Sequence, residues 1–137
     1  MAGTMSDYLE TACLNHFLKG SSYSQPAHLY VALFTVAPAR DGTGGTEVTG
    51  NGYARQICDS WTISGAEPAG AVNAVDVIFP PATPAGYGTI VAWALYDQLS
   101  GGNMLYMQSS STGFTQQTIP ANGIAKFLAG ALALTQT

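Results

Sequence analysis

The sequence predicts one mainly β domain, an antiparallel β-sandwich of jelly-roll or immunoglobulin-like type, with a short α-helix at its N-terminus. Its 137 residues suit a single domain with one core. Apolar stretches recur between turn signals from residue 27 onward, which is typical of a sandwich or barrel. Helical spacing occurs only before residue 20, and no repeat of about 20–50 residues indicates a solenoid. We therefore expect a helix within 1–20 and a sandwich over 27–137.

The predicted helix rests on apolar residues spaced three and four apart. These residues are Tyr8, Leu9, Ala12, Cys13 and Phe17. Thr4 and Asp7 have the spacing of a capping box, which predicts that Thr4 caps the helix. Gly20 provides the stop signal at the other end.

The first predicted strand covers residues 29–34, where apolar side chains point to both faces, and Pro38 ends it. Residues 39–52 are rich in glycine, so we expect an irregular arm there. Asn51 and Gly52 form a strong two-residue turn signal before a return strand over 53–57. The segment is therefore predicted to be a loop followed by a hairpin.

Three more β segments are predicted further along the chain. Residues 76–79 form a short one before two prolines, and residues 90–96 form a longer one that turns into 104–108 as a hairpin. Within 90–96, one face should carry Val91, Trp93 and Leu95. Residues 124–134 predict a long final strand, broken near Gly130. Residues 61–74 give no clear prediction.

Charge is unusually sparse. Only 9% of the residues are charged, against about a quarter in ordinary domains. The four basic residues are scattered, which argues against a nucleic-acid partner, and no apolar stretch approaches the length of a membrane helix. A surface with few charges suits a protein that packs against copies of itself or a larger assembly, because burying an unpaired charge is costly. Secreted binding modules can have an equally uncharged surface. No signal peptide is expected, because Asp7 and Glu10 interrupt the first apolar run, so the protein should be made in the cytoplasm.

No residue pattern indicates an enzyme, a metal site or a cofactor. His16 and His28 lack the spacing of metal ligands, and the serines include no nucleophile elbow. The glycine-rich loop lacks the Lys-Ser/Thr of a phosphate-binding loop. Cys13 and Cys58 read as two small buried thiols in a reducing cytoplasm, with a disulfide as the alternative.

The segment 29–56 holds the candidate functional residues, which we expect to be assembly contacts. They are Arg40, Gly42, Gly44, Gly45, Glu47, Tyr53 and Arg55. Arg55 allows two interpretations. As a structural residue it would stack on Tyr53 or Trp61 and pair with Glu47 or Asp97. As a functional residue it would contact another subunit.

The chain resembles a family of small tailed-bacteriophage structural proteins. The residues that carry the resemblance are LYVALFT at 29–35, GTEVTGNGYARQ at 45–56 and GTIVAWALYDQLSGGNMLY at 88–106. Members are commonly labelled tail fibre proteins, and some are similar to small proteins that decorate or cement capsids. The departures are 61–74 and the final 136–137. The resemblance implies a non-enzymatic virion component that works as a homo-oligomer.

Among such components, compactness favours a capsid decoration or cement protein, since a fibre normally needs a long shaft or repeats. The expected partners are further copies of the chain, in a trimer, and the major capsid protein or another virion protein. A tail or tail-fibre protein is the alternative, because the family label does not separate head from tail. A second alternative is a host-glycan binding module, whose aromatic faces would come from Tyr23, Tyr30, Tyr53, Trp61, Tyr87 and Trp93.

Overall fold

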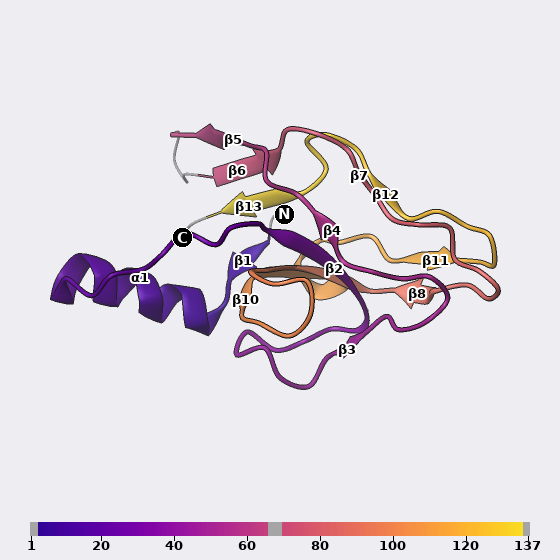
Figure 1. Ribbon diagram of the computed structural model, residues 1–137, viewed down its shortest axis with the longest axis horizontal. Helices are drawn as coiled ribbons and strands as arrows, with labels where there is room; N and C mark the ends of the chain where they lie inside the picture. Colours follow the sequence, from indigo (N-terminus) through magenta and orange to yellow (C-terminus); the bar gives the residue numbers. More distant parts are fainter. Residues whose placement is uncertain (1–2, 66–69, 136–137) are drawn as a thin grey trace.

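The computed structural model describes residues 3–65 and 70–135, which form a β-sandwich with one α-helix near the N-terminus (Figure 1). One layer is a six-stranded sheet, and three small sheets form the layer opposite. Within each sheet, paired strands of the described residues run antiparallel. The predicted fold class is therefore confirmed.

The six-stranded sheet is built around two apolar strands that pair with each other along most of their length. Its order is β1 (Thr4–Met5), β10 (Met104–Ser109), β9 (Ala92–Tyr96), β2 (Tyr30–Val36) and β3 (Thr46–Glu47), with β4 (Gln56–Ile57) also paired to β2. Ala32 lies opposite Ala94 in the register of β2 and β9. Both strands are largely buried on both faces, which explains why their sequences are apolar without polar alternation.

The opposite layer consists of short strands in three separate sheets. They are β5 (Trp61–Ser64), β6 (Gly70–Asn73) and β13 (Ala133–Thr135); β7 (Val77–Ile78) and β12 (Lys126–Phe127); and β8 (Gly88–Ile90) and β11 (Gln117–Ile119). A 3₁₀ turn, η1 (Ser110–Thr112), follows β10. The main core lies between the layers, where Leu33 and Trp93 of the large sheet meet Phe79 and Leu132.

The two ends of the described chain meet in the sandwich. Gly3 forms a parallel bridge with Leu134, its N–H donates to the carbonyl of Ala133 at 2.7 Å, and its carbonyl accepts from Thr135 at 3.1 Å. This bridge joins β1 of the large sheet to β13 of the opposite layer, and the two strands lie side by side in Figure 1.

Helix α1 spans Asp7–Lys19 and ends at Gly20, which adopts a left-handed conformation with φ 70°, as the sequence predicts. The predicted cap is wrong, because Thr4 lies in β1 and Ser6 caps the helix. The Ser6 hydroxyl accepts from the N–H of Leu9 at 3.2 Å and donates to the carbonyl of Met104. Ser6 therefore fixes the helix to β10 as well as starting it.

The predicted hairpin after the glycine-rich loop is wrong. β3 and β4 both pair with the same edge of β2, so they are two parts of one interrupted strand. Val48 still donates its N–H to the Leu33 carbonyl at 3.0 Å, and the bulge covers residues 49–55. The two-residue turn within this bulge is confirmed, since Asn51 and Gly52 have φ of 56° and 83° and the N–H of Tyr53 donates to the Gly50 carbonyl.

The predicted hairpin of β9 and β10 is confirmed. Two of the predicted strands, over 90–96 and 124–134, are each divided in the structure. The strand over 90–96 breaks at Val91, so Val91 packs on the outer face with Ala92 while Trp93 faces the main core. The long strand over 124–134 is divided between β12 and β13. Gly130, with φ 86°, turns the chain between them, near the predicted break.

Candidate functional site

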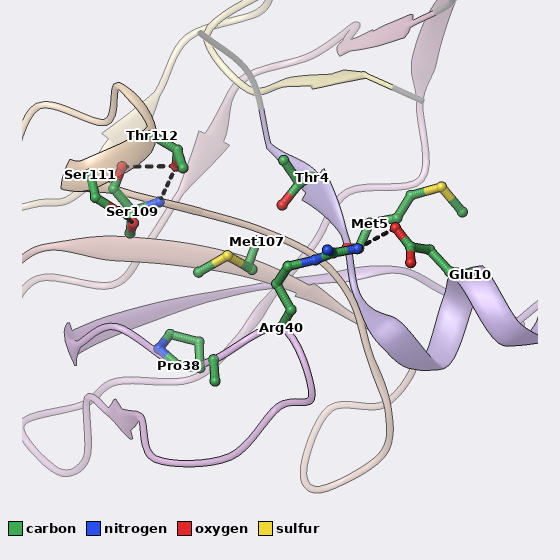
Figure 2. A pocket seen from close by; sticks show the side chains of 10 residues that line it. Thr4, Met5, Glu10, Pro38, Arg40, Met107, Ser109, Ser111 and Thr112 are labelled. Atoms are coloured by element: carbon green, nitrogen blue, oxygen red, sulfur yellow. Dashed lines mark hydrogen bonds and ion pairs between the residues drawn. The ribbon is translucent and has the colours of Figure 1, made fainter. Parts of the chain in front are cut away.

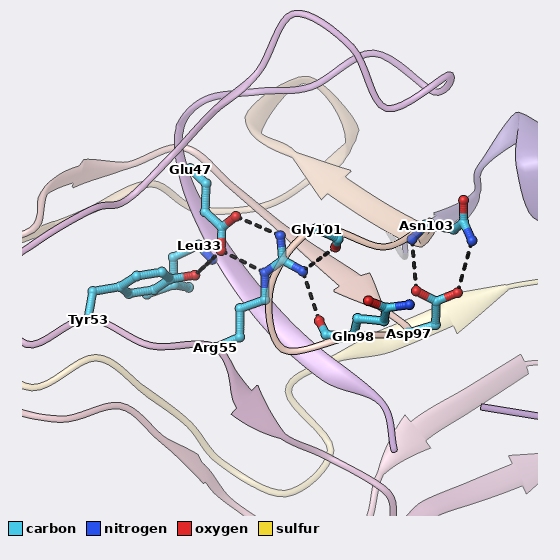
Figure 3. Close-up of polar contacts among 8 residues, drawn as sticks. All are labelled: Leu33, Glu47, Tyr53, Arg55, Asp97, Gln98, Gly101 and Asn103. Carbon is cyan, nitrogen blue, oxygen red and sulfur yellow. Dashed lines mark hydrogen bonds and ion pairs between the residues drawn. The ribbon is translucent and has the colours of Figure 1, made fainter. Parts of the chain in front are cut away.

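Arg55 lies in the bulge between β3 and β4, and its side chain is 7% exposed. Its Nε and one terminal nitrogen each donate to a different oxygen of the Glu47 carboxylate, both at 2.8 Å. This is a two-bonded pairing of guanidinium and carboxylate, which is strong and directional. Figure 3 shows the two side chains turned toward each other, with the guanidinium facing the carboxylate.

The other terminal nitrogen of Arg55 binds the turn between β9 and β10. It donates to the carbonyls of Gln98 at 2.9 Å and Gly101 at 2.8 Å. The guanidinium also lies over the ring of Tyr96, 3.8 Å from its centre, in a cation–π contact. Arg55 thus ties together two loops that are more than forty residues apart in sequence.

Tyr53 completes this cluster, which we call the Arg55 network: Glu47, Tyr53, Arg55 and the Gln98 and Gly101 carbonyls. The Tyr53 hydroxyl donates to Glu47 at 2.8 Å and accepts from the N–H of Leu33 at 3.0 Å. Leu33 lies in β2 where the bulge begins: its carbonyl still accepts from the N–H of Val48, but its own N–H has no backbone acceptor among the described residues on this edge. The hydroxyl therefore supplies the hydrogen bond that a continuous strand would have supplied.

Burial and hydrogen bonding shift the pKa values of Tyr53 and Arg55. Desolvation is the main cause that raises the pKa of Tyr53 far above its usual value, and the hydrogen bond from Leu33 opposes it. For Arg55, desolvation lowers the pKa, but hydrogen bonding and the charge of Glu47 outweigh it, so its pKa is raised. Tyr53 therefore stays neutral and Arg55 stays charged at physiological pH.

Tyr53→Phe should lower the free energy of unfolding by about 1–3 kcal/mol, because it leaves the Leu33 N–H without this acceptor and removes one of the hydrogen bonds to the Glu47 carboxylate. Urea denaturation measures this. Tyr8→Phe is the matched control, since that ring is 42% exposed, and its effect should stay within about 0.5 kcal/mol. Equal effects of the two substitutions would show that the Tyr53 hydroxyl does not support β2.

Stability should fall in alkali. Burial raises the pKa of Cys58 from 9.0 to about 11 and is also the main cause of the raised pKa of Tyr53, Tyr96 and Tyr106. The folded state keeps these protons while the unfolded chain loses them, so the contribution is complete below pH 9 and is lost as the pH rises through about 11 and beyond. Urea denaturation between pH 7 and pH 11 tests this, and an unchanged unfolding free energy would contradict it.

The glycine-rich loop is a closed turn. The Asp41 carboxylate accepts from the hydroxyl of Thr43 at 2.7 Å and from its N–H at 2.9 Å, and these bonds lower the pKa of Asp41. A side chain at Gly45 would approach Pro38 to 2.8 Å, so the loop folds back against the end of β2. Gly42 and Gly44 lie exposed at the tip with positive φ.

Arg40 lies beside the helix, where its Nε donates to the Met5 carbonyl at 3.2 Å and its guanidinium pairs with Glu10 and Asp7. It borders a cavity of about 390 Å³ between α1, the loop and η1 (Figure 2). The hydroxyls of Ser109 and Ser111 on the other side bond to each other at 2.7 Å. Figure 2 shows the Arg40 guanidinium turned toward Glu10.

The structure divides the predicted assembly contacts into two groups. Glu47, Tyr53 and Arg55 come together in the network inside the subunit, whereas Arg40 and the loop-tip glycines lie on the surface. Pairing of Arg55 with Glu47 is confirmed. Its stacking partner is Tyr96, because Tyr53 offers its hydroxyl to Glu47 and packs its ring against Phe79. A role of the surface group in assembly stays a prediction.

Sequence reasoning missed two parts of this architecture. The carbonyls of Gln98 and Gly101 carry no side-chain signal. Asn73, 1% exposed, joins β6 to the turn before β13 by donating to the carbonyls of Val75 and Leu128 and accepting from the N–H of Leu132. A single asparagine in a segment without periodicity does not reveal such a role.

The two cysteines and the two histidines lie outside the Arg55 network. Cys13 and Cys58 are free thiols, as expected. His16 contacts the Ser21 carbonyl, and His28 pairs with Asp59 at 2.7 Å. Within residues 3–65 and 70–135, no three His, Cys, Asp or Glu side chains are grouped to hold a metal. No helix in the same ranges is long and apolar enough to cross a membrane.

The fold and the Arg55 network describe a small β-sandwich protein of structural type. Its charged pair, Arg55 and Glu47, joins loops of the same subunit. Residues 4–135 match a family model described as Podophage GP4 fiber I protein gp80. The chain belongs to this family, a phage virion structural family of the tail-fibre-like kind, which confirms the resemblance. A comparison with curated proteins found no match. The family places the protein among virion structural proteins and favours a non-enzymatic role.

Proposed function

We propose that the protein is a structural component of the phage tail fibres. The observation that carries this proposal is the family match, which covers residues 4–135 and names a fiber protein. The buried Arg55 network supports a structural role, since its charged groups are used to join loops of the same subunit. The proposal replaces capsid decoration, our leading expectation, with the tail-fibre alternative.

Imaging of labelled virions tests the proposal. A gold-binding tag at the C-terminus, viewed by electron microscopy, should mark the tail. Labels distributed over the head would overturn the tail assignment. Virions that lack the protein should keep their resistance to heat and salt and lose adsorption to the host.

A capsid decoration protein is the second candidate. It is favoured by the compact sandwich, since the described ranges contain no elongated shaft. Loss of heat or salt resistance in virions without the protein, with adsorption intact, would support it. The glycan-binding alternative is weakened, because Tyr87 and Trp93 are buried and Tyr53 packs between Phe79 and Tyr87.

A further inference from the structure

Two of the five asparagines in the chain, Asn51 and Asn122, are followed by glycine. Such a pair can react with itself, because glycine has no side chain to shield its peptide nitrogen from the amide of the preceding residue. Both asparagines also adopt a left-handed backbone, with φ of 56° and 66°. Local sequence and the sign of φ are therefore alike at the two positions, and a difference in reactivity has to come from the contacts of each side chain.

The Asn51 side chain is held at both polar atoms of its amide. Its nitrogen donates to the Gly86 carbonyl at 3.1 Å, and its oxygen accepts from the N–H of Ala85 at 3.4 Å. The backbone carbonyl of Asn51 accepts from the N–H of Thr83 at 3.0 Å. Turning the amide toward the nitrogen of Gly52 breaks the two side-chain bonds, so the fold protects this position.

Asn122 lies in the turn between β11 and β12, at the end of the sandwich away from α1 (Figure 1). Its side chain is exposed, and no residue within 3–65 or 70–135 bonds to it. The N–H of Gly123 donates to the Pro120 carbonyl at 2.8 Å, which closes the turn. The amide of Asn122 is therefore free to rotate, and a local opening of the turn releases the nitrogen with which it would react.

We propose that Asn122 is a site of spontaneous deamidation in the folded protein and that Asn51 is protected. The Gly123 nitrogen loses its proton and bonds to the side-chain carbonyl carbon of Asn122, and ammonia leaves as a succinimide ring closes. Water then opens the ring at either of its two carbonyls, which gives aspartate or isoaspartate. Water is the co-reactant, and no oxidant or reductant takes part.

The isoaspartate product loosens the turn. It adds a carbon to the backbone at the point where the turn is fixed to the loop after β7. There the Ala82 carbonyl accepts from the N–H of Asn122 at 2.7 Å, and the N–H of Ala82 donates to the Gly123 carbonyl at 2.9 Å. A longer backbone between these two groups disturbs both bonds, so deamidation at this position lowers the stability of the protein.

Ageing the folded protein at mildly alkaline pH tests the proposal. Trypsin separates the two positions into the peptides 41–55 and 56–126, and fragmentation in the mass spectrometer then assigns the modified residue. Asn122 should convert at least about tenfold faster than Asn51, because two side-chain hydrogen bonds of Asn51 must break first. In guanidinium chloride, where the fold is absent, the two rates should converge. Enzymatic methylation identifies the isoaspartate product.

Two variants serve as controls. Asn122→Gly removes the amide and accepts the left-handed backbone, so the signal at this position should vanish. Asn122→Asp adds the charge without the extra carbon, and its urea midpoint should equal that of the unchanged protein, whereas the aged protein should have a lower midpoint.

Three outcomes count against the proposal. Equal rates for Asn51 and Asn122 in the folded protein overturn the difference in protection. An Asn122 that stays unmodified in the folded protein, while the unfolded chain reacts, shows that the turn itself is protective. An unchanged urea midpoint of the aged, isoaspartate-containing protein shows that the turn tolerates the longer backbone. The inference does not depend on whether the protein lies on head or tail.

Discussion

Arg55→Ala should lower the free energy of unfolding by about 3–5 kcal/mol, because it removes four charge-assisted hydrogen bonds of a buried guanidinium, two to the Glu47 carboxylate and two to the carbonyls of Gln98 and Gly101. The half-buried Glu47 carboxylate would keep only the hydrogen bond from the Tyr53 hydroxyl. The turn between β9 and β10 would lose its tie to the bulge. Urea denaturation measures the effect on the isolated protein.

Arg40→Ala is the matched control for Arg55→Ala. Both substitutions remove an arginine that pairs with a glutamate, but the Arg40 side chain is 50% exposed. Exposed pairs contribute about 0–1 kcal/mol, so Arg40→Ala should change stability little. If Arg55→Ala leaves the unfolding free energy unchanged and only reduces the oligomer mass, the residue acts between subunits and the structural interpretation is wrong.

Trp93→Ala should have a comparable effect, a loss of about 3–5 kcal/mol, because it empties the centre of the main core. Trp93 is fully buried, lies between β2 and β10, and donates its indole N–H to Gln108 at 2.9 Å. The substitution removes the largest buried side chain and leaves the Gln108 oxygen without this donor.

Two further substitutions make the Trp93 result interpretable. Trp93→Phe keeps most of the volume but removes the N–H, so it should cost less than Trp93→Ala. Ile63→Ala removes an apolar side chain that is 73% exposed, and its effect should stay within about 0.5 kcal/mol. Similar losses for Trp93→Ala and Ile63→Ala would show that the contacts of Trp93 do not determine stability.

Elements with strong local signals were predictable from the sequence. The helix end at Gly20, the strand β2 and the hairpin of β9 and β10 each follow from a run of residues that repeats a period or carries a turn signal. The helix start was missed by two residues because Thr4 and Ser6 both fit a cap, and only the contact of Ser6 with Met104 decides between them.

The small sheets were not predictable in the same way. Strands of two or three residues, such as β7 and β12, are too short to show a period, and each is defined by a partner far away in sequence. The apolar run 124–134 shows why composition alone does not define a strand. Its composition favours one strand, but Gly130 and the pairing partners in β6 and β7 divide the run between two sheets.

The candidate site was predictable in part. Arg55 is a single cation among apolar residues, and the sequence predicts Glu47 as one of its partners. The sequence also predicts that Arg55 stacks on Tyr53, whereas the Tyr53 hydroxyl bonds to the Leu33 N–H and to Glu47. The sequence cannot reveal this bond, because it depends on the bulge between β3 and β4.

The parallel bridge between Gly3 and Leu134 places the beginning and the end of the described chain side by side, running in the same direction. Fusions at the two ends would therefore be attached to the same edge of the sandwich and extend toward opposite ends of the bridged pair. N-terminal and C-terminal labels should mark the same part of the virion in the imaging experiment. A circularly permuted chain, joined by a short linker and opened at an exposed turn, is a natural way to move these attachment points elsewhere.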